Sequence, residues 1–205
     1  MFNPFRASSK SGAAWFTVGA ASSFPDLGLD AAGDPDNATV LSDPRPCRTD
    51  SDAVQPGCKV FHVPKTDSAQ RTEVAVADQG GSADSEASEI GHDMADQVLV
   101  FRYRAKFHAI DHQCPHSSFP LSKGTPFDIE DFGIVLSAGL TCPKHGWSFD
   151  LFSGLADRGS YKLKIWEVQL RDMDGKQVST SNDNAEDVAN AKDQEVWVRR
   201  KQRMG

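Results

Sequence analysis

Four residues that can ligate a metal lie in two short blocks of the sequence. The first block holds Cys114 and His116 in a Cys-x-His arrangement, and the second holds Cys142 and His145 in a Cys-x-x-His arrangement. Proline follows both cysteines, and Gly146 follows the second histidine. Thiolate and imidazole are ligands of zinc and of iron–sulfur centres. The two blocks therefore predict one metal centre, held by two loops that converge in space.

The residues that flank the blocks favour an iron–sulfur cluster over zinc. Gly146 lacks a Cβ atom, which lets backbone N–H groups approach a cluster sulfide closely. The second block runs directly into Trp-Ser-Phe-Asp-Leu at 147–151, a strand pattern that would brace the ligand loop. Spacing alone leaves zinc open, so a zinc-stabilised binding module is kept as an alternative.

The chain resembles the soluble Rieske ferredoxins, in which two His replace two Cys on one iron of a [2Fe–2S] cluster. The resemblance extends beyond the two blocks, to residues 15–19, 24–27, 98–124, 140–154 and 163–171. The interval between the blocks is longer than is usual for the family, and we place the extra residues in a surface loop at 125–132. The resemblance implies that Cys114 and Cys142 hold the inner iron, and that His116 and His145 hold the outer iron near solvent.

The resemblance also bears on the redox potential. High-potential Rieske proteins carry an extra cysteine in each ligand loop, and hydroxyl donors follow their second histidine. Here Phe119 and the neighbours of Trp147 include no cysteine, and Trp147 and Phe149 replace the hydroxyl donors. Fewer hydrogen bonds stabilise the reduced cluster less, which implies a potential near the low end of the Rieske range, about −150 mV. Both aromatic residues are expected to cover the cluster as an apolar lid.

Short apolar segments separated by Gly, Pro and polar stretches predict an all-β domain. The expected strands lie at 13–18, 60–63, 98–103, 106–110, 133–138, 147–150, 162–170 and 195–199. Segment 133–138, Gly-Ile-Val-Leu-Ser-Ala, is expected to be a buried strand. The resemblance implies the Rieske fold, which stacks antiparallel sheets and adds a small cluster-binding subdomain.

Polar stretches are expected to be loop insertions in a single domain that spans residues 14–200. They lie at about 26–58, 65–97 and 173–193, and we expect a flexible tail at 1–13 and a basic tail at 201–205. Residues 66–97 carry a formal charge of −7, which equals that of the whole chain, so the acidity belongs to one segment. The pattern at 186–191 is compatible with a short amphipathic helix.

The other histidines show no ligand pattern. His108 and His112 are four residues apart, but they lie on an expected strand and at its exit, where packing or surface roles fit better than a metal. No partner signal accompanies His62 or His92.

The cellular setting is inferred from the cysteines and from what the sequence lacks. Residues 1–14 lack the apolar core of a secretory signal, and no run of 18 apolar residues predicts a membrane helix. A reducing cytoplasmic location is therefore expected, where cysteine pairs bind metal more often than they form disulfides. Cys47 and Cys58 lie outside the two blocks. Three interpretations stay open for them, namely that they pair with each other, that they form a second redox site, or that they are two loop thiols.

Composition narrows the function. A net charge of −7 argues against nucleic-acid binding. The sequence has no Gly-rich dinucleotide motif, no catalytic triad and too few histidines for the mononuclear iron of a Rieske oxygenase. We expect a monomeric electron carrier without a catalytic site of its own, serving an electron-donating reductase and an electron-accepting oxygenase or reductase. The alternatives are a Rieske-like subunit of a multi-component oxygenase or nitrite reductase, and a redox-sensing or zinc-stabilised binding module.

Overall fold

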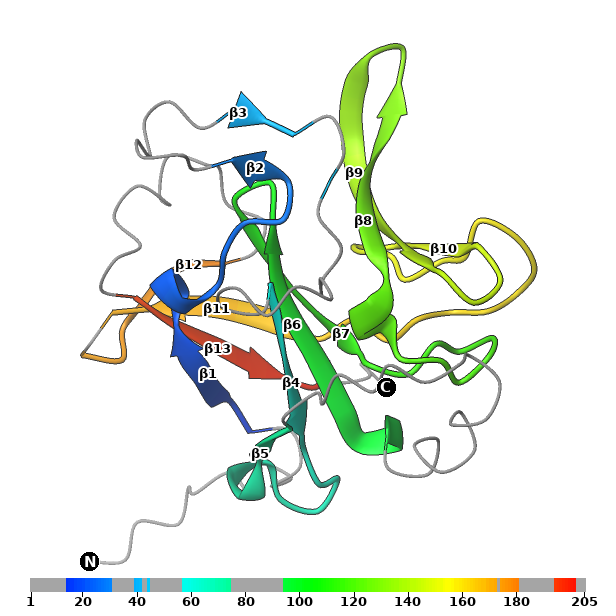
Figure 1. Cartoon of the computed structure of the whole chain (residues 1–205). Coiled ribbons are helices and arrows are strands. Elements are labelled where there is room, and N and C mark those ends of the chain that lie inside the picture. The colour runs from blue at the N-terminus through cyan, green and yellow to red at the C-terminus, as the bar shows by residue number, and fades with distance from the viewer. Residues whose placement is uncertain are drawn as a thin grey trace, which may run out of the picture.

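The chain folds into antiparallel β-sheets with very little helix (Figure 1). The computed structural model describes residues 14–30, 39–41, 44, 57–74, 94–172, 174–180 and 194–201. The only helices in this part of the chain are 3₁₀ turns, at Ala21–Ser23 (η2), Ser68–Gln70 (η4), Met94–Asp96 (η5) and Leu121–Lys123 (η6). The all-β fold class expected from the sequence is confirmed.

The first sheet joins the two ends of the domain. Its strands are β1 (Phe16–Ala20), β13 (Glu195–Arg199), β11 (Glu167–Arg171) and β12 (Gln177–Thr180), in the order β1-β13-β11-β12. β13 reads Glu-Val-Trp-Val-Arg, and its two valines are fully buried while its other side chains are partly exposed. This alternation is what a strand with one covered face requires.

The second sheet passes through the centre of the molecule. Its strands are β5 (Thr72–Val74), β4 (Cys58–His62), β6 (Gln97–Tyr103) and β7 (Lys106–Asp111), in that order. Successive side chains of a strand point to opposite faces of its sheet. Val98 and Val100 of β6 thus enter one apolar core against the first sheet. Leu99 and Phe101 enter a second core that includes the two candidate ligand cysteines.

The turn between β6 and β7 has an unusual backbone. Arg104 and Ala105 have φ angles of 50° and 61°, which side chains with a Cβ rarely adopt. Asp26, whose side chain is almost fully buried, accepts the backbone N–H of Arg104 at 3.1 Å and that of Ala105 at 2.6 Å. One carboxylate from an early segment therefore holds a tight hairpin turn that lacks glycine.

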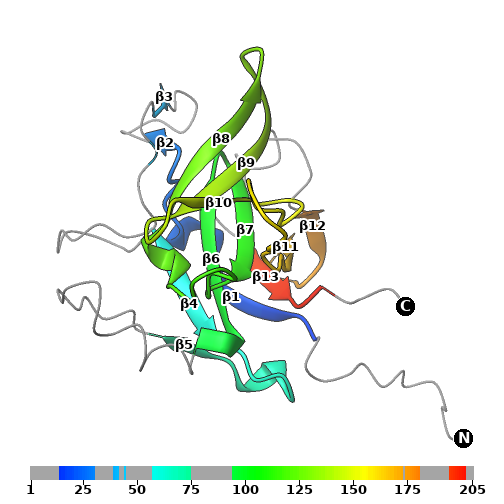
Figure 2. The same cartoon turned by 90° about the vertical axis from the view of Figure 1, so that its right-hand side faces the viewer.

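The third sheet is a long hairpin with a short strand added at its base. β8 (Thr125–Asp131) and β9 (Ile134–Cys142) pair along their lengths, and β10 (Trp147–Asp150) pairs only with 139–142 of β9. Figures 1 and 2 show the free end of this hairpin projecting from the body of the molecule. A small sheet of β2 (Leu29–Asp30) and β3 (Thr39–Val40) completes the described strands.

Two expectations for the long hairpin were wrong. Of residues 125–132, expected as a surface loop, 125–131 form strand β8 and Phe132 lies in the turn at the tip of the hairpin. The segment expected as a buried strand does lie in β9, but Ile134, Val135 and Leu136 are exposed. A run of aliphatic residues predicts a strand, but burial requires a covering element, and none of the described segments covers this half of the hairpin.

The stretches expected as loop insertions contain ordered strands where they are described. Cys58 opens β4 and is a buried free thiol, so its assignment to a loop was wrong. β5 and β12 also lie inside these stretches, where pairing with β4 and β11 stabilises polar sequences as edge strands. Several predictions fall outside the described residues, namely the 1–13 and 202–205 tails, the helix at 186–191, Cys47 and His92. None of the described helices is long and apolar enough to cross a membrane.

Candidate cluster-binding site

The first ligand loop leaves β7 and returns through η6. Within it, the backbone N–H of Cys114 donates to the Phe119 carbonyl at 2.9 Å, and that of Ser118 donates to the Cys114 carbonyl at 2.9 Å. Ser118 adopts a φ of 53° to make this reversal. The N–H of Leu121 closes the loop on the His112 carbonyl at 2.8 Å. The loop is thus held by its own backbone bonds.

The second ligand loop is the tight turn between β9 and β10. Gly146 donates its N–H to the Cys142 carbonyl at 3.0 Å, and its φ is +66°. A Cβ atom added there would meet no protein atom within 4 Å. Glycine is favoured at this position because of its positive φ angle, and not because a neighbouring protein atom would clash with a Cβ atom. Trp147 then starts β10 directly opposite Cys142.

The two cysteines are buried side by side. Cys114 and Cys142 are each 1% exposed and share a hydrogen bond, which lowers the pKa of Cys114 and raises that of Cys142. The Ser117 hydroxyl lies 4.0 Å from the sulfur of Cys142, within the range of a hydrogen bond to sulfur. A thiolate is the form of cysteine that binds a metal, and the lowered pKa of Cys114 favours that form.

The two histidines lie beside each other nearer the surface. The rings of His116 and His145 are 5.1 Å apart and nearly perpendicular, with His145 exposed and His116 half-buried. The Nδ1 atom of His116 is buried and has no hydrogen-bond partner among the described residues. A buried polar atom without a partner costs about 1–3 kcal/mol, which coordination to a metal would offset.

Aromatic residues enclose the His116 ring. Trp147 stacks on it at 4.4 Å between centroids, and Tyr161 meets it edge-on at 5.2 Å. The guanidinium of Arg158 lies 5.5 Å from the Trp147 ring and donates to the Gly146 carbonyl at 2.9 Å. The expected covering role suits Trp147.

Phe149 belongs to the core instead. It is fully buried and pairs with Leu140 across the β9–β10 ladder. Tyr161 and Arg158 were missed from the sequence because no spacing relates them to the ligand blocks. Only the folded loop between β10 and β11 brings them there.

The two histidines before the first block have packing roles. His112 is buried, and its ring nitrogens contact the Gln97 side-chain oxygen at 2.8 Å and the Ser122 hydroxyl at 2.9 Å. Its ring therefore fixes the loop that carries Cys114. His108 is buried between the rings of Phe101 and Phe152. Burial lowers the pKa of both imidazoles to about 4, which keeps them neutral.

The candidate ligands meet as two pairs. In the part of the chain that the structure describes, no three Cys, His, Asp or Glu side chains gather closely enough for one metal ion. Two buried thiols and two imidazoles nearer solvent match the donor set of a cluster with Cys on one iron and His on the other. The residues present therefore fit a mixed-ligand cluster.

Comparison with known proteins finds a matching domain family and similar proteins. Residues 59–164 match the model of the Rieske [2Fe-2S] domain. Apoptosis-inducing factor 3 of Homo sapiens is 32% identical over 133 residues, which cover 61% of this chain and 17% of that protein. The methanesulfonate monooxygenase ferredoxin subunit of Methylosulfonomonas methylovora is 32% identical over 80 residues, covering 39% of this chain and 58% of that subunit.

Among solved structures, the complex of reduced oxygenase and oxidized ferredoxin in carbazole 1,9a-dioxygenase includes a similar chain. It has a TM-score of 0.39 and 16% identity, and the match covers 93% of this chain and 97% of that one. The present chain spans less than two thirds of the length of either curated relative.

Proposed function

We propose, since the chain belongs to the family of Rieske [2Fe–2S] domains, that it carries single electrons between two partner proteins. A Rieske domain binds a [2Fe–2S] cluster, and the cluster supplies a reversible one-electron couple. We assign its ligands to the two pairs described above, with the inner iron on Cys114 and Cys142 and the outer iron on His116 and His145.

The observation that carries the proposal is the unequal burial of the two ligand pairs. The cysteines are 1% exposed, whereas the His145 ring is exposed and the His116 ring is half-buried. An electron that leaves through an imidazole edge has a short path to a docked protein. The buried thiolates keep solvent from the inner side of the site, and Trp147 shields one face of the outer side.

The proposed partners are an electron-donating reductase and an electron-accepting oxygenase or reductase. Support comes from the names of similar proteins, since one is a ferredoxin subunit of a monooxygenase. We propose that the chain has no catalytic site of its own and works in the cytoplasm. A stable stoichiometric complex with an oxygenase or nitrite reductase would instead identify it as a subunit.

The experiment that tests the function is spectroscopic. The purified protein should contain two irons and two sulfides per chain, and dithionite should produce the rhombic EPR signal of a cluster with mixed Cys and His ligands. His116→Ala and His145→Ala should lose that signal. His62→Ala, on β4 outside the site, is the matched control and should keep it. A colourless protein with one tightly bound zinc would refute electron transfer and leave a zinc-stabilised module.

A further inference from the structure

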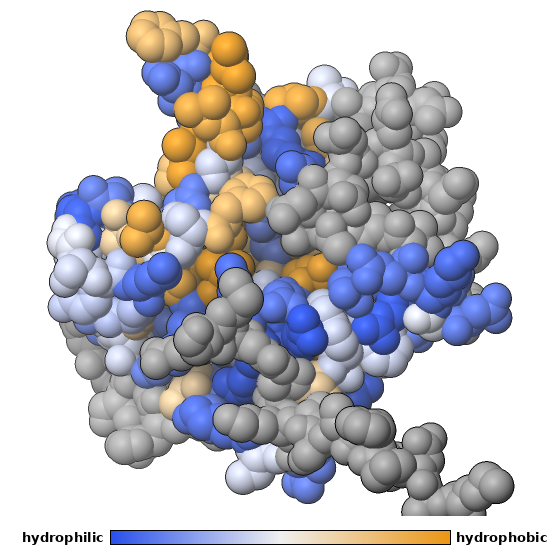
Figure 3. All heavy atoms as spheres, turned by 180° about the vertical axis from the view of Figure 1, so that it is seen from behind, coloured by the Kyte–Doolittle hydropathy of each residue, from blue (hydrophilic) through white to orange (hydrophobic). Residues whose placement is uncertain are grey.

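The free end of the β8–β9 hairpin, residues 128–136, exposes an unusual amount of apolar surface. Phe132 is 98% exposed, and Ile134, Val135 and Leu136 are 65%, 54% and 65% exposed. Figure 3 shows hydrophobic atoms gathered on this projection. Contiguous apolar surface on a water-facing projection is typical of a contact site for another macromolecule.

The turn at this tip places the phenyl ring outward at a conformational cost. Phe132 and Gly133 have φ angles of 49° and 77°, the pattern of a two-residue hairpin turn that favours Asn-Gly. A bulky residue is rare with a positive φ. The backbone conformation of this turn therefore disfavours phenylalanine. The exposed ring makes no contact within the described chain that would offset this cost.

Acidic side chains accompany the apolar ones. Glu130 lies opposite Val135, and Asp131 lies opposite Ile134, so each face of the hairpin tip carries one carboxylate beside one aliphatic group. Both acidic residues are exposed. Asp128, nearer the base, is already paired with Arg104 and Tyr103. The surface that the tip offers is apolar and negatively charged.

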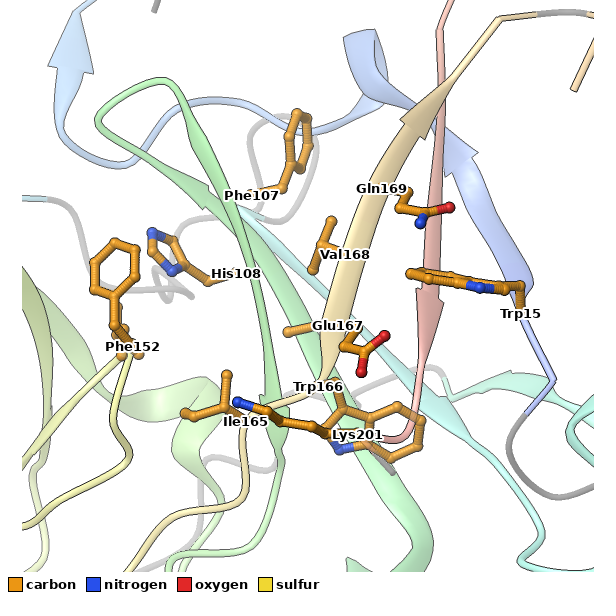
Figure 4. A pocket seen from close by; sticks show the side chains of 12 residues that line it. Trp15, Phe107, His108, Phe152, Ile165, Trp166, Glu167, Val168, Gln169 and Lys201 are labelled. Atoms are coloured by element: carbon orange, nitrogen blue, oxygen red, sulfur yellow. The ribbon is translucent and has the colours of Figure 1, made fainter. Parts of the chain in front are cut away.

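A groove with the opposite charge lies elsewhere on the same molecule. It has a volume of about 660 Å³, and it joins a smaller hollow of about 270 Å³, shown in Figure 4, through four shared residues. Those shared residues are Phe152, Ile165, Trp166 and Lys201. The rest of the rim is strongly basic, with Lys65, Lys162, Lys164 and Arg200, whereas one acidic residue lines the groove, Asp111, and one lines the smaller hollow, Glu167.

Five cationic side chains line the groove, and two of them are available to a ligand. Lys65 and Arg200 approach Asp96 at 2.9 and 3.6 Å, and Lys164 approaches Asp111 at 3.3 Å. Lys162 and Lys201 are exposed and have no ion pair with any described residue. The groove thus offers an apolar floor and two unpaired ammonium groups, which matches the two carboxylates and the apolar side chains of the hairpin tip.

We propose that the hairpin tip of one copy of this chain docks into the groove of a second copy. The charges and the apolar surfaces are complementary, and the hairpin projects away from the body that carries the groove (Figures 1 and 2), which favours a contact between molecules. If each of two copies inserts its hairpin tip into the groove of the other, a closed dimer forms. If each copy instead inserts its tip into the next copy along, chains of molecules form. The proposal departs from the monomer expected from the sequence and does not depend on the redox function.

Sedimentation velocity of the full chain with its cluster, over a concentration series, tests the contact. The wild type should associate with increasing concentration, and added salt should weaken association by screening the ion pairs. Phe132→Asn keeps a residue that tolerates the positive φ and removes the ring, so it should raise the dissociation constant about tenfold or more. A wild type that stays monomeric throughout the series would overturn the proposal, even if the hairpin then proved to bind a different protein.

Charge exchange provides the sharper test. One variant carries Glu130→Lys with Asp131→Lys, and the other carries Lys162→Glu with Lys201→Glu. Each variant alone should sediment as a monomer, because its hairpin and groove then repel each other, and an equimolar mixture should associate again. The matched control for the hairpin variant, Glu73→Lys with Asp174→Lys, makes the same charge change as that variant at exposed sites elsewhere and should associate like the wild type. Failure of the mixture to associate, or equal loss in the control, would refute the hairpin–groove contact.

Discussion

At the scale of single residues, the site is organised by the burial of its donors. The proposed cysteine ligands, Cys114 and Cys142, lie in the apolar core between the second and third sheets, and the proposed histidine ligands lie at its edge. The sequence supplied these four donors, but it suggested few hydrogen bonds to them. Ser117 changes that picture, because its hydroxyl lies 4.0 Å from the Cys142 sulfur. A donor to a ligand sulfur stabilises the reduced cluster and raises the potential.

Ser117→Ala should therefore lower the reduction potential. A hydrogen bond that is stronger by about 1 kcal/mol in the reduced state than in the oxidised state corresponds to about 40 mV for a one-electron couple. Redox titration followed by EPR measures the shift. Ser153→Ala, on an exposed turn, is the control and should leave the potential unchanged. A potential that is the same in Ser117→Ala and in the wild type would show that this hydroxyl does not donate to the site.

His108 makes the fold sensitive to acid. Its pKa in the folded protein is lowered to about 4, chiefly by burial, while an unfolded histidine titrates near 6.5. As the pH falls from about 6.5 to about 4, the unfolded state gains a proton that the folded state does not, so stability is lost over this window. The loss approaches about 3 kcal/mol. His108→Phe, which keeps an aromatic ring between Phe101 and Phe152, should reduce the slope of this part of the pH profile of urea unfolding, and the slope that remains belongs to His112, whose pKa is lowered in the same way. An unchanged profile would mean that other groups cause the acid sensitivity.

At the scale of elements, the β6–β7 hairpin depends on a residue far from it in sequence. Asp26 accepts both N–H groups of the Arg104–Ala105 turn and approaches Arg102 at 3.6 Å. Hairpin sequences with two positive φ angles normally use Asn and Gly. The turn is stable here because the carboxylate satisfies its donors, so this early segment and the central sheet fold together.

Asp26→Ala should destabilise the protein by about 2–4 kcal/mol, because two N–H groups and a cation lose their acceptor. Urea denaturation of the loaded protein measures the loss. For comparison, Asp67→Ala removes the N-cap of the short helix η4 and should cost about 1 kcal/mol. Replacing Ala105 by Gly in the Asp26→Ala background should recover part of the stability, since glycine adopts the positive φ freely. Equal stability of Asp26→Ala and wild type would refute the role of the carboxylate.

At the scale of the whole molecule, the first and last described strands close the fold. β13 lies between β1 and β11 in the first sheet, and its buried Val196 and Val198 enter the core that also holds Phe16. Strands from both ends of the domain are needed to cover one face of the central sheet. The limits of 14–200 stay a prediction, and β13 lies within them.

Truncation tests this closure. A chain that ends at residue 193 should lose cooperative unfolding, because removal of an interior strand exposes the core and leaves the partners of β13 unpaired. Circular dichroism melts compare it with a chain that ends at residue 201, which should melt like the full protein. A cooperative melt of the shorter chain would show that β1 and β11 can pair without β13.

The sequence by itself determined the all-β class and the position of most strands, and it predicted a donor set for the cluster. The ligand spacing and the alternation of apolar residues are local properties, so Cys114, His116, Cys142, His145 and strands such as 195–199 were predictable from them. Tertiary structure alone decided which surfaces are covered. Tyr161 reaches His116, Asp26 holds a distant turn, and Ile134 to Leu136 remain exposed because no described element packs on them. Elements that are far apart in the chain determine which side chains are buried and which residues touch, so a local sequence pattern cannot predict either.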